Sequence, residues 1–212
     1  MRTLAAVGAV SMVVLGSAGQ AVGHPGLPSR FIAAVRHTHH ASPSLKRTAR
    51  LLVKQDAKAR AARPTGAKAR LSTLELDIVA RINQERTSRG LRALRVSRGL
   101  TAAADYHSRQ MGLFGFFEHE SHNGAPFWRR IERFYPAGRG YYSVGENIFW
   151  ESPDTSGASA VHEWMVSPPH RQNILTREWR DLGVAAVHFA AAPGAFGGRP
   201  VTIVTADFGV RH

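Results

Sequence analysis

Apolar residues recur at regular spacings over much of the chain, and the spacing changes along it. Between residues 72 and 90, three apolar residues follow one another at intervals of four: Leu74, Ile78 and Ile82. This spacing places them on one face of a helix that Ser72 or Thr73 would begin and Gly90 would end. The segment is therefore predicted to be an amphipathic helix.

Two further helices are predicted from the same periodicity. The first begins near Ser97 and carries five residues along one face: Leu100, Ala103, Ala104, His107 and Met111. On that face His107 is interpreted as a buried core histidine rather than a ligand. The second covers residues 156–166 and ends before Ser167, because its apolar residues share a helical face: Val161, Trp164 and Met165.

The last third of the chain changes to a pattern typical of strands. Residues 182–192 (LGVAAVHFAAA) and 199–210 (RPVTIVTADFGV) are apolar and carry β-branched residues, and the turn-forming sequence PGAFGG separates them. This arrangement predicts an antiparallel hairpin. Helices followed by strands indicate the α+β fold class.

The stretch from Gly112 to Gly157 shows little periodicity. It is rich in glycine, proline, histidine and aromatic residues, and it is predicted to be a long irregular segment packed by its aromatic side chains. Long irregular segments inside a compact domain are usually functional. Candidate chemistry is therefore expected there.

Residues 1–23 have a different organisation. Arg2 precedes an apolar run from Leu4 to Leu15, and small residues follow as far as Ala21 and Gly23. This pattern predicts a secretory signal peptide, because the apolar run is shorter than the roughly 20 residues that span a membrane. The mature protein is expected to be secreted, without a transmembrane segment, and to be associated with the cell wall if its basic part binds there.

The net charge of +13 is concentrated in residues 24–70. This segment has eleven Lys or Arg and one Asp, whereas residues 71–212 have sixteen Arg and fourteen acidic residues. With few large apolar side chains, residues 24–70 are predicted to be a basic disordered linker. A solubilising spacer and attachment to an anionic wall polymer or lipid are equally compatible with it; intracellular nucleic acid is not an expected partner. Its histidine tract, residues 37–40, is a weak indication of metal binding.

The absence of cysteine narrows the chemistry. Disulfides, a thiol nucleophile and a cysteine-ligated metal are all excluded. Residues 71–212 must therefore be held together by a hydrophobic core, for which their length is sufficient. A monomer is the expected state.

The sequence SPPHRQNIL, residues 167–175, is predicted to begin a short helix. Ser167 would be the N-cap and Pro168 the first helical residue, which places His170 at the third position. The positive end of the helix dipole discourages protonation there. Because a metal ligand or general base must be a neutral imidazole, His170 is a candidate site residue.

Five motifs occur in a fixed order: FFEHESHNGAPFWRRI, GENI, WMVSPPHRQNIL, DLGV and ADFG. In that order and with these gaps they resemble the bacterial branch of the CAP superfamily, whose SCP domain is shared with cysteine-rich secretory proteins, antigen 5 and plant pathogenesis-related proteins. The upstream sequence with Asn83 and Arg86 also resembles the opening helix and loop of that branch. The resemblance covers roughly residues 74–209 and assigns residues 71–212 to one CAP/SCP domain. It implies a three-layer α-β-α sandwich with a central, mainly antiparallel sheet.

The resemblance also implies a cleft in which two histidines and an acid converge. Carried over residue by residue, these are His119 in FEHES, Glu146 in GENI and His170 in SPPH. Many animal and plant members have a second glutamate three residues after a tryptophan. Ser167 stands three residues after Trp164, so this acid is missing here.

Other polar residues near these motifs receive structural interpretations. His122 could supply a further ligand, but an exposed turn histidine is the preferred interpretation. Glu163 would point in a different direction on its helix. Neither Ser121 nor Ser167 lies in the turn that a serine nucleophile occupies, and HEWMV lacks the second histidine of a zincin motif.

Two imidazoles and a carboxylate are compatible with three roles. They could hold zinc or another divalent cation with a water in an open position. Without metal, Glu146 could orient a histidine that acts as a base. They could also be a polar cluster that pins the long segment to the helix start, without chemistry.

Two functions are compatible with these residues. The first is a secreted binding protein whose cleft takes a divalent metal and an extracellular or cell-envelope ligand, such as a lipid, a glycan or a wall fragment. The second is a metal-assisted hydrolase of cell-envelope or extracellular substrates, with His119, Glu146 and His170 as its catalytic residues. Binding is preferred, because one carboxylate would have to serve as both ligand support and base, and no separate nucleophile is visible. Whether the protein is an enzyme is left open.

Overall fold

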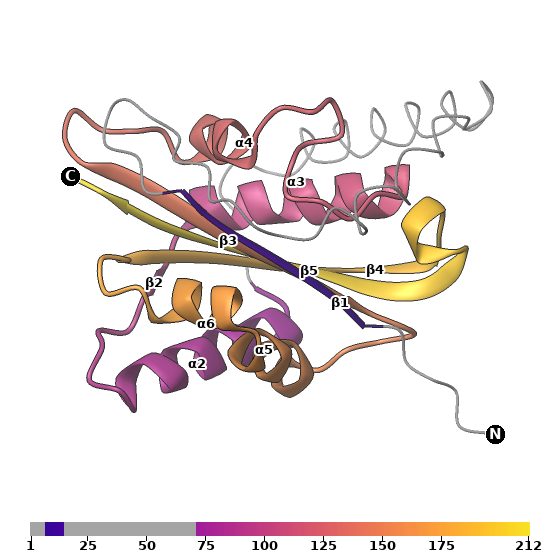
Figure 1. Cartoon of the computed structure of the whole chain (residues 1–212), viewed down its shortest axis with the longest axis horizontal. Coiled ribbons are helices and arrows are strands. Elements are labelled where there is room, and N and C mark those ends of the chain that lie inside the picture. The colour runs from indigo at the N-terminus through magenta and orange to yellow at the C-terminus, as the bar shows by residue number, and fades with distance from the viewer. Residues whose placement is uncertain (1–6, 15–70) are drawn as a thin grey trace. The chain divides into compact units, whose positions relative to one another are not determined.

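The computed structural model describes residues 7–14 and 71–212 (Figure 1). The predicted linker with its histidine tract and most of the predicted signal peptide lie outside the described residues. The elements follow one another in this order: β1 (Val7–Val14), α2 (Thr73–Thr87), β2 (Arg95–Val96), α3 (Arg98–Phe114), α4 (Phe127–Phe134), β3 (Tyr142–Glu151), α5 (Gly157–Val166), α6 (Pro168–Leu175), β4 (Asp181–Ala192), the 3-10 turn η1 (Gly194–Phe196) and β5 (Arg199–Arg211).

The strands form one sheet in the order β1-β3-β5-β4-β2. Strand β1 pairs antiparallel with β3, β3 with β5, and β5 with β4, whereas the short β2 runs parallel to β4. Strand β1 lies along the outer edge of β3, with Met12 opposite Glu146. The sheet is mainly antiparallel, as predicted. The role of residues 1–23 as a secretory signal stays a prediction.

Helices cover both faces of the sheet (Figure 1). Helices α3 and α4 lie on one face, and α2, α5 and α6 lie on the other. On the first face Leu100 and Ile131 pack in one buried cluster with Val144 of β3. On the second face Ile78 and Trp164 pack in another cluster that includes residues of β4 and β5. The three-layer α-β-α sandwich is therefore confirmed.

The predicted helix starts are confirmed by their caps. Ser72 and Glu75 form a capping box, in which each side chain accepts a hydrogen bond from the other residue's backbone N–H. Ser97 caps α3 and Ser156 caps α5 through their hydroxyl oxygens. Each cap satisfies a backbone donor that has no partner inside the helix, so local sequence determines where these helices begin.

The prediction of an irregular segment from Gly112 to Gly157 is wrong in part. The segment contains helix α4 and the ten-residue strand β3. Helix α4 has only eight residues and begins after Pro126 without a side-chain cap, so the usual start signals are missing. Strand β3 is buried on both faces over residues 143–150, which removes the alternation that marks a half-exposed strand. The GENI motif therefore lies in a strand within the sheet.

The predicted hairpin is confirmed. Strands β4 and β5 pair antiparallel, and η1 lies in the glycine-rich connection between them. Strand β5 is buried over residues 201–210, so its polar members face the interior. In the part of the chain that the structure describes, no helix is both long and apolar enough to cross a bilayer.

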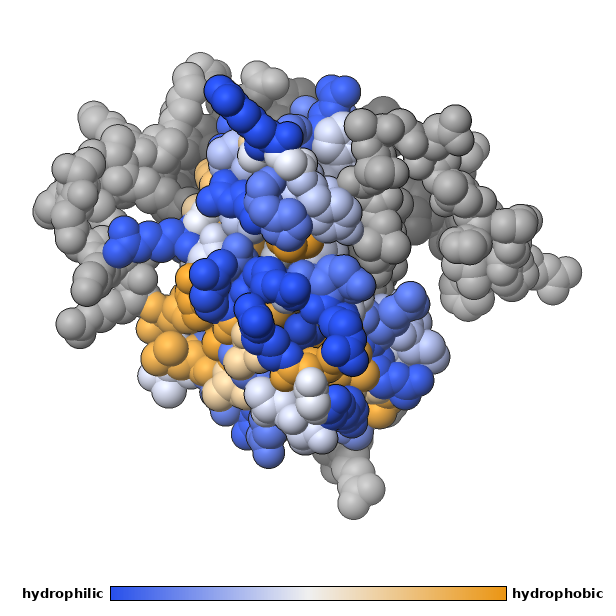
Figure 2. All heavy atoms as spheres, turned by 90° about the vertical axis from the view of Figure 1, so that its left-hand side faces the viewer, coloured by the Kyte–Doolittle hydropathy of each residue, from blue (hydrophilic) through white to orange (hydrophobic). Residues whose placement is uncertain are grey.

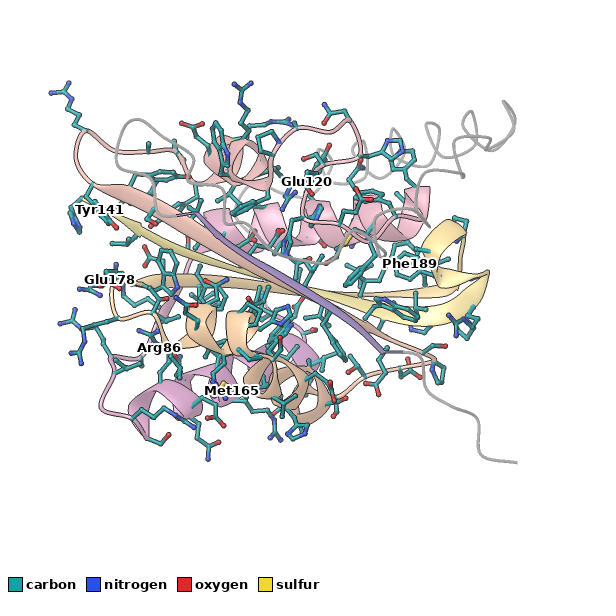
Figure 3. The ribbon with its side chains drawn as sticks, viewed as in Figure 1. Arg86, Glu120, Tyr141, Met165, Glu178 and Phe189 are labelled. Atoms are coloured by element: carbon teal, nitrogen blue, oxygen red, sulfur yellow. The ribbon has the colours of Figure 1, made fainter. Side chains whose placement is uncertain are left out.

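A buried arginine joins three segments on the α2 side of the sheet (Figure 3). Arg86 of α2 donates through Nε to the carbonyl oxygen of Arg92 at 2.9 Å. Its Nη1 donates to the carbonyl oxygens of Ile174 at 2.6 Å and Thr176 at 2.8 Å. The last carbonyls of a helix lack partners within it, so Arg86 serves as the C-terminal cap of α6. Burial lowers the pKa of Arg86 to about 10, which leaves it charged at neutral pH.

Candidate functional site

Glu146 of β3 is the centre of a buried polar cluster. Its side chain is fully buried. Oε1 accepts a hydrogen bond from Nδ1 of His119 at 2.8 Å, and Oε2 pairs with Nη2 of Arg130. The structure therefore brings together two of the three predicted site residues, His119 and Glu146, and adds a buried arginine to them.

Arg130 comes from helix α4 and holds both members of this pair. Besides Glu146, it binds the backbone carbonyl oxygen of His119 through Nη1 at 3.0 Å. Burial by itself would raise the pKa of Glu146. The positive charge of Arg130, with contributions from His107 and His119, outweighs burial and holds the pKa of Glu146 below its usual range. The carboxylate is therefore ionised at neutral pH.

The pairing determines which ring nitrogen of His119 carries a proton. An ionised carboxylate only accepts hydrogen bonds, so Nδ1 of His119 must be the donor. The other nitrogen, Nε2, is buried and has no hydrogen-bond partner among residues 71–212. Buried polar atoms are nearly always paired, so an exception on a ring whose other nitrogen is firmly held needs an explanation. Nε2 of His119 is therefore an atom at which this cluster can bind something else, as is Nδ1 of His107.

His107 of α3 lies beside Glu146. Its Nε2 donates to the backbone carbonyl oxygen of Glu118 at 2.9 Å and lies 3.8 Å from Oε1 of Glu146. Burial lowers the pKa of His107 to about 3, so the ring is neutral at neutral pH. The interpretation of His107 as a buried core histidine is confirmed. Its position next to Glu146 was not predicted.

Asp207 of β5 is a second buried carboxyl in the cluster. It lies directly opposite Glu146 across the two strands, and its side chain is fully buried. Burial raises the pKa of Asp207 well above its usual value, and the negative charge of Glu146 raises it further. Neither oxygen of Asp207 has a hydrogen-bond partner among the described residues, so burial beside an ionised carboxylate favours the protonated form of Asp207.

His170 occupies the predicted third position of α6. Ser167 is the N-cap and Pro168 the first helical residue, as expected, but the Ser167 hydroxyl does not cap the backbone. It is hydrogen-bonded to Nδ1 of His170 at 2.7 Å instead. The capping hydroxyl that the sequence predicted therefore orients the imidazole.

Two asparagines anchor the His170 segment to strand β3. Asn147 donates from Nδ2 to the backbone carbonyl oxygen of His170 at 3.2 Å. Asn173 donates to Oδ1 of Asn147 at 2.9 Å. Glu146 and Asn147 are consecutive in a strand, so their side chains leave opposite faces. His119 is held through Glu146 on one face, and His170 is held through Asn147 on the other.

This arrangement limits the kind of metal site that the residues can form. Within residues 71–212 no group of three or more His, Asp or Glu side chains is placed to hold a metal ion. Both oxygens of Glu146 are already bound by His119 and Arg130. The residues thus do not fit a site with Glu146 as a third protein ligand. They leave Nε2 of His119 as a donor, with the carboxylate behind its ring.

His122 is an exposed turn histidine, as the sequence predicted. Its ring stacks on Phe114 with 4.3 Å between the ring centres.

Arg130 and Asp207 are the members of the cluster that sequence reasoning missed. Both stand inside quoted motifs, FFEHESHNGAPFWRRI and ADFG, yet neither was assigned a role. Pairing the strand that contains ADFG with the strand that contains GENI would have put Asp207 opposite Glu146. Recognising that residues 127–134 form helix α4 would have shown that Arg130 lies on it.

Comparison with known proteins decides the family. A model of the cysteine-rich secretory protein (CAP) family matches residues 79–206, more than half of the chain. The chain belongs to the CAP family. The CAP match contains His107, His119, Arg130, Glu146 and His170, and it ends one residue before Asp207.

Bacterial relatives of this CAP protein agree with the fold. A curated relative is the uncharacterized protein YkwD of Bacillus subtilis, which is 29% identical over 161 residues, covering 72% of this chain and 60% of the relative. Among solved structures, an extracellular SCP-domain protein of Bacillus anthracis matches with a TM-score of 0.50 and 22% identity, over 68% of this chain and 45% of that one. An outer surface protein of Borrelia burgdorferi matches with a TM-score of 0.51 and 16% identity, over 66% and 97%.

Proposed function

We propose that this CAP protein is a secreted binding protein whose site, centred on His119, takes an extracellular or cell-envelope ligand, a lipid or a wall fragment. The solved bacterial structures that share its fold are described as extracellular or outer surface proteins. The predicted signal peptide and the basic linker support the same location, at an anionic wall. The chain spans about 60% of the curated relative's length, so the proposal concerns the CAP domain.

One observation carries this proposal. Nε2 of His119 is buried without a hydrogen-bond partner among the described residues, while the rest of that histidine is held firmly by Glu146 and Arg130. Two charged groups thus hold the residue and orient its ring nitrogen. Positioning of this kind costs stability through buried charge and is typical of binding sites.

A divalent cation at this site would be held by Nε2 of His119. Asn147 holds the His170 segment on the opposite face of β3, so whether His170 shares the ion is decided by the experiment below. Glu146 would then be the carboxylate that orients a metal-binding imidazole from behind, a common arrangement in metalloproteins. When bound, the cation would supply a Lewis acid for an oxygen of the ligand. Zinc is the natural choice for imidazole donors.

The alternative, a metal-assisted hydrolase, fits the geometry less well. It needs a general base with a pKa near the working pH. Glu146 is poorly suited, because both of its oxygens are occupied and Arg130 helps to hold its pKa below the usual range. His107 is neutral, and its Nε2 is bound to the Glu118 carbonyl. Binding is therefore the better-supported function.

Zinc titration by calorimetry on the full chain tests the proposal. We compare the wild type with His119→Ala and His170→Ala, and with His162→Ala as a control, since His162 is exposed on α5. The histidine tract of residues 37–40 is present in all four proteins, so any zinc that it binds is common to them. We expect His119→Ala to lose one bound zinc and the control to lose none; a loss in His170→Ala as well would make His170 a second ligand of the same ion. Equal stoichiometry in all four folded proteins would contradict the metal-binding part of the proposal.

The ligand itself is tested with the same variants. Wild type and His119→Ala are incubated with purified cell-wall fragments and with phospholipid vesicles. Retention that falls in His119→Ala but not in His162→Ala supports a ligand at this site. Release of new amine or reducing ends by the wild type, lost in His119→Ala, would favour the hydrolase instead.

A further inference from the structure

Arginines gather at one end of the CAP domain, away from the histidine site. Residues 88–98, 136–141, 176–181 and 211–212 meet there: Arg95 pairs with Asp181 across β2 and β4, and Arg211 binds the carbonyl oxygen of Pro136. Figure 3 places Tyr141 and Glu178 at this same end. These four segments carry eight of the sixteen arginines of residues 71–212. We call this surface the arginine end.

Most of this positive charge has no acidic counterpart. Among the described residues the structure gives no hydrogen bond or ion pair to four exposed guanidinium groups: Arg92, Arg98, Arg139 and Arg177. The acids of the arginine end are Glu178 and Asp181, and Arg95 already pairs with Asp181 at 3.0 Å. Figure 2 views this end and shows hydrophilic side chains over most of its uncovered surface. A field of one sign on one face favours an anionic partner.

Two exposed apolar side chains lie among these arginines. Val96 is 46% exposed and Tyr141 is 40% exposed, and they belong to the four large apolar residues that are exposed within the described part of the chain. Tyrosine with basic residues is the composition that proteins present to the interface of a bilayer. A soluble polyanion offers no apolar region for Val96 and Tyr141 to contact, whereas a bilayer does.

We propose that the arginine end docks the CAP domain on an anionic phospholipid surface. The arginines come from four separate segments and spread over one end, which suits a flat, extended partner. Guanidinium groups bind phosphate oxygens in a two-pronged geometry that lysine cannot reproduce, and residues 71–212 contain no lysine. The surface adds a second, independent contact to that predicted for the linker. Docking here leaves the histidine site, in the middle of β3, to its own ligand.

Vesicle sedimentation with the full chain tests this docking. Vesicles of phosphatidylcholine with about 30% phosphatidylglycerol are compared with vesicles of phosphatidylcholine alone. The test variant is Arg92→Gln/Arg177→Gln, and the control is Arg129→Gln/Arg199→Gln, which removes the same charge from exposed positions elsewhere. The linker is identical in all proteins. We expect the test variant to bind anionic vesicles about tenfold more weakly than the control, because each basic residue near the surface contributes severalfold to affinity.

A second variant separates a lipid surface from a soluble polyanion. Val96→Ser/Tyr141→Ser should weaken binding to anionic vesicles and leave binding to soluble inorganic polyphosphate unchanged. Loss in the arginine variant without loss in the apolar variant would assign the surface to a soluble polyanion and overturn the lipid assignment. Equal weakening in the test and control arginine variants would show that only net charge matters, and would overturn the docking surface itself.

Discussion

Arg130 is the residue on which the buried cluster depends most. Replacement by methionine keeps the apolar stem but leaves the ionised Glu146 buried without its cationic partner. Such a loss costs about 3–5 kcal/mol of stability. We therefore expect Arg130→Met to lower the free energy of unfolding by that amount in urea denaturation.

Two controls sharpen this prediction. Arg129→Met, next to it on α4 but exposed, should cost less than about 1 kcal/mol, since it loses only a contact with Trp128. The double variant Arg130→Met/Glu146→Gln should recover part of the loss, because the buried charge is then gone. A double variant as unstable as the sum of its single variants would contradict the ion-pair account.

The raised pKa of Asp207 predicts that this residue stabilises the folded protein less as the pH rises. Its pKa is raised in the folded protein, so folding binds a proton that the unfolded chain releases above pH about 4. From there up to its native pKa, the contribution of Asp207 to stability decreases as pH rises, by about 1.4 kcal/mol per pH unit. Asp207→Asn puts a neutral amide of similar size next to Glu146 and removes this dependence.

The comparison is made by urea denaturation of wild type and Asp207→Asn at several pH values. We expect the stability of the variant relative to wild type to increase with pH across that window. Other groups titrate in both proteins and cancel in the difference. A difference that stays constant with pH would show that Asp207 is ionised in the folded state.

Single residues of the site differ in how far sequence could identify them. His119, Glu146 and His170 were predicted because they stand in motifs of the CAP family. Arg130 and Asp207 act through burial next to Glu146, and burial depends on the packing of α4 and β5 against β3, which no local pattern specifies.

Gly145 determines how closely α6 can approach strand β3. A Cβ atom at this position would lie 2.4 Å from Oδ1 of Asn173 and 3.0 Å from the ring of Trp179. Asn173 holds Asn147 and, through it, the His170 segment. We expect Gly145→Ala to destabilise the fold by about 1–3 kcal/mol, as overpacking does in a dense core.

Thermal unfolding of Gly145→Ala measures this effect, with Gly138→Ala as the control. At Gly138 a Cβ atom would meet only a carbonyl oxygen at 3.4 Å, an ordinary contact. The control should therefore unfold close to the wild type. Similar melting of both variants would mean that the approach of α6 to β3 tolerates a methyl group.

Elements with strong local signals were predicted, and those without them were not. Helices α2, α3 and α5 each have a serine cap and a periodic apolar face, and the β4–β5 hairpin has a glycine-rich turn. Strand β3 is buried on both faces and carries Glu146 and Asn147 in its interior. A strand that is buried on both faces and contains polar site residues shows no alternation of apolar and polar positions, because some of its buried positions are polar.

In the folded domain the positive charge is unevenly distributed, which the net charge of each stretch of sequence does not show. Residues 71–212 are nearly balanced, so the sequence located the positive charge in the linker. Folding brings four distant segments together and concentrates eight arginines at one end. A contact between remote segments has no signature in the composition of any one of them.

The protonation of the His119 ring tests the account of the site most directly. Long-range nitrogen–hydrogen NMR of the imidazoles, with His119 assigned through His119→Gln, distinguishes the two ring nitrogens. We predict a proton on Nδ1, bonded to Glu146, an unprotonated Nε2, and a change in the Nε2 signal when zinc is added. A proton on Nε2, or an Nε2 signal that zinc leaves unchanged in the folded protein, would contradict it.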